Sequence, residues 1–252
     1  MAARTPLIAG NWKMYGRRAD LAEIAKLGAR LGEAKGRVEA LICPPAPYIA
    51  AAVEAARGST VVIGGQDCSS VGADAARTGE VNAGMLADQG ARYVIVGHSE
   101  RRTLLGETDE VVKAKAEAAV AVGLTPIVCV GETAAHRSAG QVGAVVSAQS
   151  LASAPGQGKF VIAYEPVWCI GGDRTPTMDE IGKAHGFIRA ALAERYGAAT
   201  AEATRILYGG SVGPKNAAEV FGARGVDGAL VGRASLKADD FSAIIFAHPA
   251  AS

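Results

Sequence analysis

The sequence has little excess of charge of either sign. Its 252 residues include 26 Lys and Arg and 25 Asp and Glu, which leaves a formal net charge of +1. Electrostatic binding to nucleic acid or to an anionic membrane surface needs a basic excess, which this balance does not supply. We therefore exclude nucleic acid and membranes as the main partners.

Cysteine is also rare, and the four cysteines are far apart. Cys43, Cys68, Cys129 and Cys169 form no CxxC pair, and no His cluster lies beside them. Such spacing is not typical of a structural zinc site or of a disulfide framework. We expect small buried thiols and no metal site.

Long apolar runs are absent too. No run approaches the roughly 20 residues that cross a bilayer, and the start of the chain lacks the apolar stretch, about 7–15 residues long, of a secretory signal. The sequence therefore predicts a cytoplasmic protein.

What the sequence does contain is a large apolar fraction, 49% of residues, arranged in short recurring runs. Most runs are rich in Val and Ile and apolar at successive positions, which is typical of strands covered on both faces. The eight runs are Pro6–Gly10, Val38–Cys43, Val61–Gly65, Tyr93–Gly97, Pro126–Gly131, Phe160–Tyr164, Ile206–Gly209 and Gly228–Gly232. Between them lie segments with helical spacing, for example Asp20–Leu31, Asp109–Val122, Met178–Tyr196, Pro214–Phe221 and Ala238–Phe246.

Strands that alternate with helices predict a parallel α/β fold, and the number of strands decides which one. Dividing 252 residues by eight gives about 31, the size of one strand with its crossover helix. No Pro/Ser-rich linker divides the chain, and the first strand is followed by NWKMYG, not by the GxGxxG turn of a dinucleotide-binding sheet. We predict one domain over residues 1–252, an eight-stranded parallel (β/α)8 barrel, in preference to an open doubly wound sheet.

Chemically useful side chains follow several of the predicted strands. In a barrel the loops after the strands meet on one face, so these residues form one candidate site. They are Asn11, Lys13, His98, Ser99, Glu100, Glu165, Gly209, Gly210, Ser211, Gly232 and Arg233. Each is a weak signal alone, but their coincidence on one face indicates an active site. His136, His185 and His248 lie in helical or terminal segments, and we expect them to be structural.

Several of these residues lie in motifs that resemble triosephosphate isomerases. The motifs are NWKM at 11–14, VGHSERR at 96–102, GET at 106–108, AYEPVW at 163–168, YGGSV at 208–212 and DGALVG at 227–232. They occur in the family's order and span nearly the whole chain. The resemblance implies a TIM barrel that interconverts dihydroxyacetone phosphate and glyceraldehyde 3-phosphate through an enediolate, without metal or organic cofactor, in glycolysis and gluconeogenesis.

The resemblance also implies a role for each catalytic residue. Glu165 matches the base that moves a proton between two adjacent carbons, and His98 and Asn11 match donors to the enediolate oxygens. Lys13 supplies positive charge. Because SERR after His98 is expected to open a helix, partial positive charge at its N-terminus disfavours imidazolium, and we expect a neutral ring.

The phosphate of the sugar is expected to lie against backbone N–H groups at glycine-rich turns. The resemblance assigns this role to Gly171, Ser211, Gly232 and Arg233, with Gly171 in a lid of residues 169–175. Closure of such a lid excludes water from the enediolate. Trp168 and Pro176 flank the lid, and the supporting residues are expected to be Ser99, Glu100, Tyr208 and Gly210.

Three residues depart from the family's usual pattern. Arg233 and Asp173 stand where glycine is common, and Pro176 replaces Ala or Ser and has no N–H to offer the Tyr208 hydroxyl. A Gly-Arg pair also occurs in relatives that isomerise four-carbon ketose phosphates, so an erythrulose phosphate isomerase is the alternative. A non-catalytic phosphate-binding barrel is less favoured, because a binder has no need of Glu165.

The resemblance finally implies a homodimer acting on a small phosphorylated sugar. The polar loop of residues 64–80 corresponds to the family loop that enters a pocket beside the partner's first loop. Gln66 and Thr78 match that loop, whereas Asp67 replaces a frequent Asn. We expect Lys13 to be held in place partly from across the interface.

Overall fold

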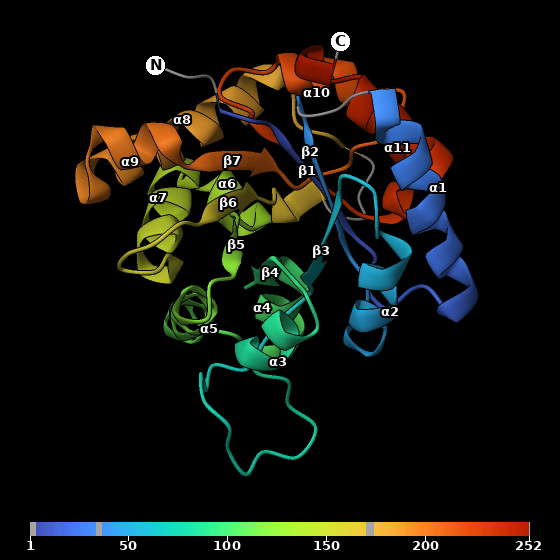
Figure 1. Ribbon diagram of the computed structural model, residues 1–252. Coiled ribbons are helices and arrows are strands. Elements are labelled where there is room, and N and C mark those ends of the chain that lie inside the picture. Colours follow the sequence, from blue (N-terminus) through green and yellow to red (C-terminus); the bar gives the residue numbers. More distant parts are fainter. Residues whose placement is uncertain (1–3, 34–36, 170–173, 252) are drawn as a thin grey trace.

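Eight parallel strands close into a barrel in the order in which they occur along the chain (Figure 1). The computed structural model describes residues 4–33, 37–169 and 174–251. The strands are β1 (Leu7–Asn11), β2 (Glu39–Cys43), β3 (Val61–Gly65), β4 (Tyr93–Val96), β5 (Thr125–Val130), β6 (Val161–Tyr164), β7 (Arg205–Tyr208) and β8 (Gly228–Val231). The predicted closed barrel is thereby confirmed, and each predicted strand is found within a few residues of its expected place.

Each strand is apolar at successive positions because both of its faces are covered. Side chains at alternate positions fill the barrel interior, which contains Leu7, Ala9, Leu41, Tyr93, Ile95, Ile127, Cys129, Val161, Ala163, Leu207 and Leu230. The intervening side chains, such as Ile8, Ile42 and Val94, belong to a second apolar layer between the strands and the helices. These two layers explain why the strands do not show the alternation of a half-exposed sheet.

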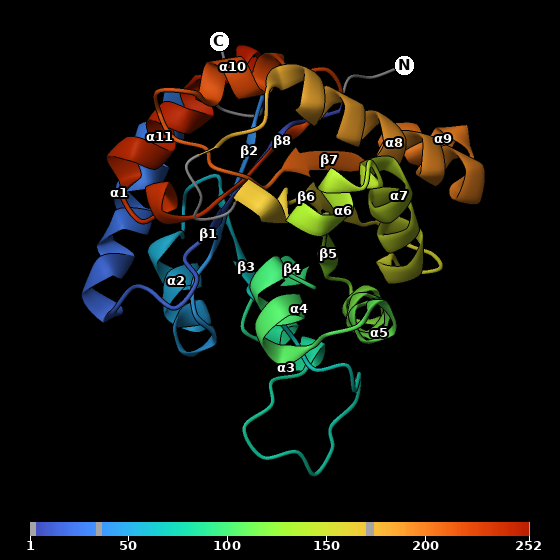
Figure 2. The same ribbon diagram turned by 180° about the vertical axis from the view of Figure 1, so that it is seen from behind.

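Helices surround the barrel, as Figures 1 and 2 show from opposite sides. They are α1 (Ala22–Arg30), α2 (Ile49–Ala55), α3 (Ala83–Asp88), α4 (Ser99–Leu105), α5 (Asp109–Ala121), α6 (Ala134–Ser138), α7 (Val142–Ser153), α8 (Met178–Tyr196), α9 (Ala198–Ala203), α10 (Ala217–Gly222) and α11 (Ala238–Phe246). α8 has its predicted bounds, and Thr177 and Glu180 cap its start reciprocally. α10 begins at Ala217 and not at Pro214, because Asn216 bonds back to Gly213 and Ser211 in a turn.

The barrel closes where β8 pairs with β1. Leu7 to Gly10 lie in register with Gly228 to Val231. Gly228 has φ +141°, and a Cβ there would lie 1.9 Å from the carbonyl oxygen of Leu7. Glycine is therefore required at this seam.

The segment between β3 and α3 projects from the barrel as a long loop without helix or strand (Figures 1 and 2). We call residues 66–81 the arm. The predicted loop began two residues earlier, but Gly64 and Gly65 belong to β3. Among the described helices, none is long and apolar enough to cross a membrane. That residues 1–252 form one domain stays a prediction.

Candidate active site

The carboxyl ends of the strands surround a cavity of about 590 Å³. Most of the predicted site residues line it: Asn11, Lys13, His98, Glu100, Glu165, Gly209, Gly210, Ser211, Gly232 and Arg233. Ser99 and Tyr208 are buried beside it. Gly171 and Asp173 lie outside the described residues, so their predicted places remain predictions.

Glu165 follows β6 and is almost fully buried, with 2% of its surface exposed. Its backbone N–H donates to the carbonyl of Val130 at 2.8 Å, which fixes it to the end of β5. Its carboxylate accepts hydrogen bonds from Ser99, through the backbone N–H at 2.9 Å and the hydroxyl at 3.0 Å. His98 Nε2 lies 3.1 Å from Glu165 Oε1. Two hydrogen bonds from Ser99 thus compensate this carboxylate for lost hydration, with the ring of His98 beside it.

His98 caps the start of α4, where sequence motif SERR was expected to open a helix. Its Nδ1 accepts a hydrogen bond from the backbone N–H of Glu100 at 3.2 Å, so Nδ1 carries no proton. Nε2 lies 3.1 Å from Glu165 Oε1, so a hydrogen on Nε2 would lie toward the carboxylate. The bond to Nδ1 favours the tautomer that has its hydrogen on Nε2.

Lys13 has a strained backbone conformation, with φ +52°. A non-glycine residue in this left-handed region costs about 1 kcal/mol or more, so neighbouring groups must hold it. Lys13 N–H donates to Asn11 Oδ1 at 2.9 Å, and Gln66 Nε2 donates to the carbonyls of Lys13 and Cys43, each at 2.9 Å. The arm therefore takes part in fixing Lys13.

The ammonium group of Lys13 bonds Glu100 Oε1 at 2.6 Å. Partial burial alone would raise the pKa of Glu100, but the hydrogen bond and the charge of Lys13 lower it. Glu100 is 46% exposed on its side chain, so the ion pair is open to solvent and exchangeable.

Glycines bring the backbone close to Glu165 and Tyr208 after β7. A Cβ on Gly209 would lie 2.9 Å from Glu165 Cγ, and one on Gly210 would lie 2.1 Å from the Tyr208 hydroxyl. Within the described residues, no hydrogen bond uses the backbone N–H of Ser211 or Arg233. No described residue engages these two N–H groups on the cavity wall, so they suit the binding of an anion.

A buried carboxylate, Glu132, lies at the start of the predicted lid. Its Oε1 accepts hydrogen bonds from Tyr164 at 3.1 Å and from the indole of Trp168 at 2.7 Å. Burial raises the pKa of Glu132. Glu132 was not among the predicted site residues, although it comes two residues after β5 and its place at a strand end is a signal in the sequence.

Comparisons with known proteins agree on one family. The sequence profile of triosephosphate isomerase matches residues 6–248. The chain is 55% identical to the triosephosphate isomerase of Afipia carboxidovorans, over 97% of this chain and 98% of that protein. It is 53% identical to that of Xanthobacter autotrophicus, over 99% of both chains. The crystal structure of triosephosphate isomerase from Bartonella henselae superposes with a TM-score of 0.88 at 40% identity, covering 96% of this chain and 98% of that one. From its profile, its relatives and its barrel, the chain belongs to the triosephosphate isomerase family.

Proposed function

We propose that this protein interconverts dihydroxyacetone phosphate and D-glyceraldehyde 3-phosphate. The observation that carries the proposal is the contact between a buried carboxylate, Glu165, and the imidazole of His98 at the mouth of a barrel of this family. One carboxylate can take a proton from one carbon and return it to the next. One uncharged N–H donor can serve both oxygens of the enediolate between them.

Glu165 acts as the base in this proposal. Both of its oxygens are engaged by Ser99 in the substrate-free site, so the carboxylate exchanges these bonds for the substrate's carbon acid. His98 Nε2–H and the amide of Asn11 donate to the two substrate oxygens. Lys13 leaves Glu100 and turns its charge to the substrate.

The phosphate lies in the proposal against the free backbone N–H groups of Ser211 and Arg233 and against Gly232. Gly171 of the lid completes this set on the strength of the family resemblance. Tyr208 and Gly210 support the loop, because only glycine at 210 leaves room for the Tyr208 hydroxyl.

The test is turnover by the purified protein. We expect glyceraldehyde 3-phosphate to be converted with a kcat/KM far above that for erythrulose 4-phosphate or erythrulose 1-phosphate, in assays coupled to NADH oxidation or followed by NMR. Failure to isomerise the triose phosphate contradicts the proposal.

The four-carbon alternative is favoured by one observation, the Arg233 side chain at the cavity wall. A guanidinium beside the phosphate site changes the space and charge available to a longer substrate. Arg233→Gly distinguishes the two functions. It raises the preference for triose over tetrulose phosphate if Arg233 selects the longer substrate, and otherwise leaves the ratio unchanged.

We also propose that the protein acts as a homodimer. A second hollow of about 740 Å³ lies beside the active site between the arm and α4, and it shares Lys13, His98 and Glu100 with that site. Exposed apolar side chains surround it, with Met14 95% and Leu104 77% exposed. Covering such side chains favours association, and the tip of a partner's arm, near Thr78, is the proposed occupant.

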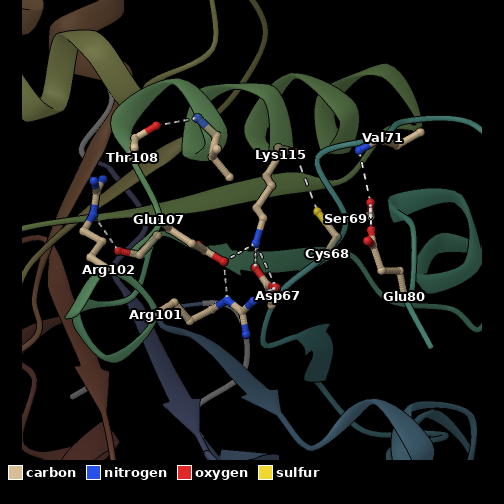
Figure 3. Close-up of polar contacts among 12 residues, drawn as sticks. Asp67, Cys68, Ser69, Val71, Glu80, Arg101, Arg102, Glu107, Thr108 and Lys115 are labelled. Carbon is tan, nitrogen blue, oxygen red and sulfur yellow. Dashed lines mark hydrogen bonds and ion pairs between the residues drawn. The ribbon is translucent and has the colours of Figure 1, made fainter. Parts of the chain in front are cut away.

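The arm is well anchored for this task. Asp67, Lys115, Glu107 and Arg101 form a closed ring in which positive and negative charges alternate (Figure 3). Lys115 bonds both oxygens of Asp67, at 2.8 and 2.9 Å, and Glu107 at 2.5 Å. The ring joins the root of the arm to α4 and α5.

Sedimentation velocity at micromolar concentration tests the dimer. We expect the wild type to sediment as a dimer and Met14→Arg to shift it toward monomer with loss of activity. A fully active wild-type monomer contradicts the proposal. We further propose a cytoplasmic location, where the four cysteines, all free and buried, stay reduced.

A further inference from the structure

The β4–β5 ladder stops one step short of the active site. Its last pair in register is Val96 with Val128. The next residues along the two strands are Gly97 and Cys129, and their carbonyls accept hydrogen bonds from the same side chain. Arg102 donates to Gly97 O through Nε at 2.9 Å and to Cys129 O through Nη2 at 3.1 Å. A guanidinium from α4 thus supplies the link that the ladder lacks.

The guanidinium is itself fixed from its outer side. Nη1 donates to Asp109 Oδ1 at 2.6 Å, and Nη2 donates to the hydroxyl of Ser153 at 2.8 Å. Ser153 in turn donates to the same Asp109 oxygen at 2.8 Å. Asp109, the first residue of α5, and Ser153, the last of α7, therefore bond one edge of the guanidinium. The two carbonyls bond its other edge. Figure 3 shows that Arg102 lies apart from its neighbour Arg101, which pairs with Asp67 at the root of the arm.

The two bridged carbonyls stand directly before the reacting groups. The Gly97 carbonyl belongs to the peptide unit that leads into His98. Cys129 precedes Val130, whose own carbonyl accepts the backbone N–H of Glu165 at 2.8 Å. A cavity of about 70 Å³ lies between Arg102 and Glu165, lined also by Ser99 and Gln149. Packing there is incomplete, so hydrogen bonds must set the spacing of the two strand ends.

We propose that Arg102 is a positioning residue that sets the distance between His98 and Glu165 by bridging the ends of β4 and β5. This inference rests on the proposed isomerase function. Arginine suits the task because its planar fork presents several donors in fixed directions, whereas lysine is a single flexible point charge. Gly97 leaves room at this place, since it has φ +65° and a Cβ there would lie 2.7 Å from both γ-carbons of Val112 and 3.1 Å from Arg102 Nη2.

The test is Arg102→Lys, measured against a matched arginine at the other end of the barrel. Arg189 also donates to two backbone carbonyls, Ala201 and Thr204, and to a carboxylate, Asp227. The two side chains are similarly buried, 15% and 17% exposed. Arg189→Lys is therefore the control: it removes a similarly buried guanidinium that lies far from His98 and Glu165.

We expect Arg102→Lys to lower kcat about ten- to a hundredfold, because small misplacements of reacting groups have effects of this size. KM and the affinity for sn-glycerol 3-phosphate should change less than about threefold, since the phosphate site follows β7 and β8. Arg189→Lys should lower Tm comparably but leave kcat within about twofold. The inference is wrong if Arg102→Lys keeps its kcat, or if both variants lose kcat equally.

Ser153→Ala decides the question should Arg102→Lys fail to fold. It removes the hydroxyl that holds Nη2 from its outer side, so the donor to the Cys129 carbonyl is placed less firmly. We expect kcat to fall about two- to fivefold with KM unchanged. An unaltered kcat overturns the inference. Absence of triose phosphate turnover in the wild type would instead overturn the proposed function, so the two failures are distinguishable.

Discussion

The two ends of the barrel are both rich in charged groups, but these groups are used differently. At the amino end, Arg205 bonds Glu39 at 2.5 Å and the hydroxyl of Tyr93 at 2.7 Å, and Tyr93 donates to Glu39 at 2.9 Å. The three groups satisfy one another in a closed set. Asp227 is likewise saturated, by Arg4, Arg189 and the backbone N–H of Ile206.

At the carboxyl end the partners are exchangeable. Lys13 is paired with the half-exposed Glu100, and Glu165 is held by hydrogen bonds that a substrate can replace. Size does not distinguish the ends, because the amino end has a hollow of about 920 Å³, larger than the active-site cavity. What marks the functional end is the presence of groups whose bonds can be exchanged.

Removing one carboxylate from each end gives the largest expected contrast. Glu165→Ala should lower kcat by about 10²–10⁴-fold, since it removes the proposed base, while sn-glycerol 3-phosphate still binds. Glu39→Gln should leave kcat unchanged and lower the free energy of unfolding by about 1–3 kcal/mol. Steady-state kinetics and urea unfolding of both variants measure this. A folded Glu165→Ala protein with near-normal kcat would refute the assignment.

The next contrast separates two groups within the carboxyl end. His98→Gln should lower kcat by about 10²–10³-fold, because it misplaces a donor to the enediolate. Lys13→Ala should instead mainly weaken the binding of dianionic ligands, since it removes the nearest cation. The ¹⁵N NMR signals of His98 near pH 7 should show a protonated Nε2 and an unprotonated Nδ1. An imidazolium there would contradict the neutral-donor role.

A buried histidine near the amino end gives a smaller effect, on stability. Burial lowers the pKa of His185 from 6.5 to about 4, and among the described residues its ring bonds only the carbonyl of Gly225. Below pH 6.5 the unfolded chain takes up a proton that the folded chain does not, so stability falls as the pH falls. The loss should approach about 3 kcal/mol near pH 4.

Urea unfolding near pH 7 and near pH 4.5, at one protein concentration, measures this dependence. His185→Gln is the control and should show a correspondingly smaller loss in acid. If the two proteins lose stability in parallel, another group is responsible.

The smallest effect is expected from the Tyr208 hydroxyl. No hydrogen bond of the described residues uses it, and Pro176, which is buried, has no N–H to donate. Proline at this hinge restricts Thr175 and leaves fewer conformations to lose on closure, which offsets the missing bond. Tyr208→Phe should therefore lower kcat/KM less than about tenfold. A hundredfold loss in stopped-flow or steady-state assays would show that the hydroxyl anchors the closed lid.

The strands and the place of the site could be predicted because both follow from short-range patterns. Val- and Ile-rich runs marked the strands, and barrel geometry then gathered Asn11, His98 and Glu165 on one face. The bounds of α8 followed from helical spacing, and the structure adds the cap at Thr177 that fixes its start. These features depend on residues close together in the chain or on the symmetry of the fold.

The remaining features depend on contacts between distant residues. Lys13 meets Glu100 across 87 positions, and Arg102 reaches the carbonyl of Cys129 across 27. Nothing in the spacing of SERR distinguishes Arg101, which pairs with Asp67 of the arm, from Arg102, which bonds the ends of two strands. The left-handed backbone of Lys13 was also unpredictable, since only the fold supplies the bonds that hold it.

The seam between β1 and β8 has a consequence for how the protein is made. Every other neighbouring pair of strands is also consecutive in the chain, whereas this pair joins the first strand synthesised to the last. Until the ribosome has released β8, the growing chain therefore carries two unpaired strand edges, at β1 and at its newest strand. Such edges invite pairing with other chains. Premature termination before Gly228 should thus yield an aggregating product and not a shorter, weaker barrel.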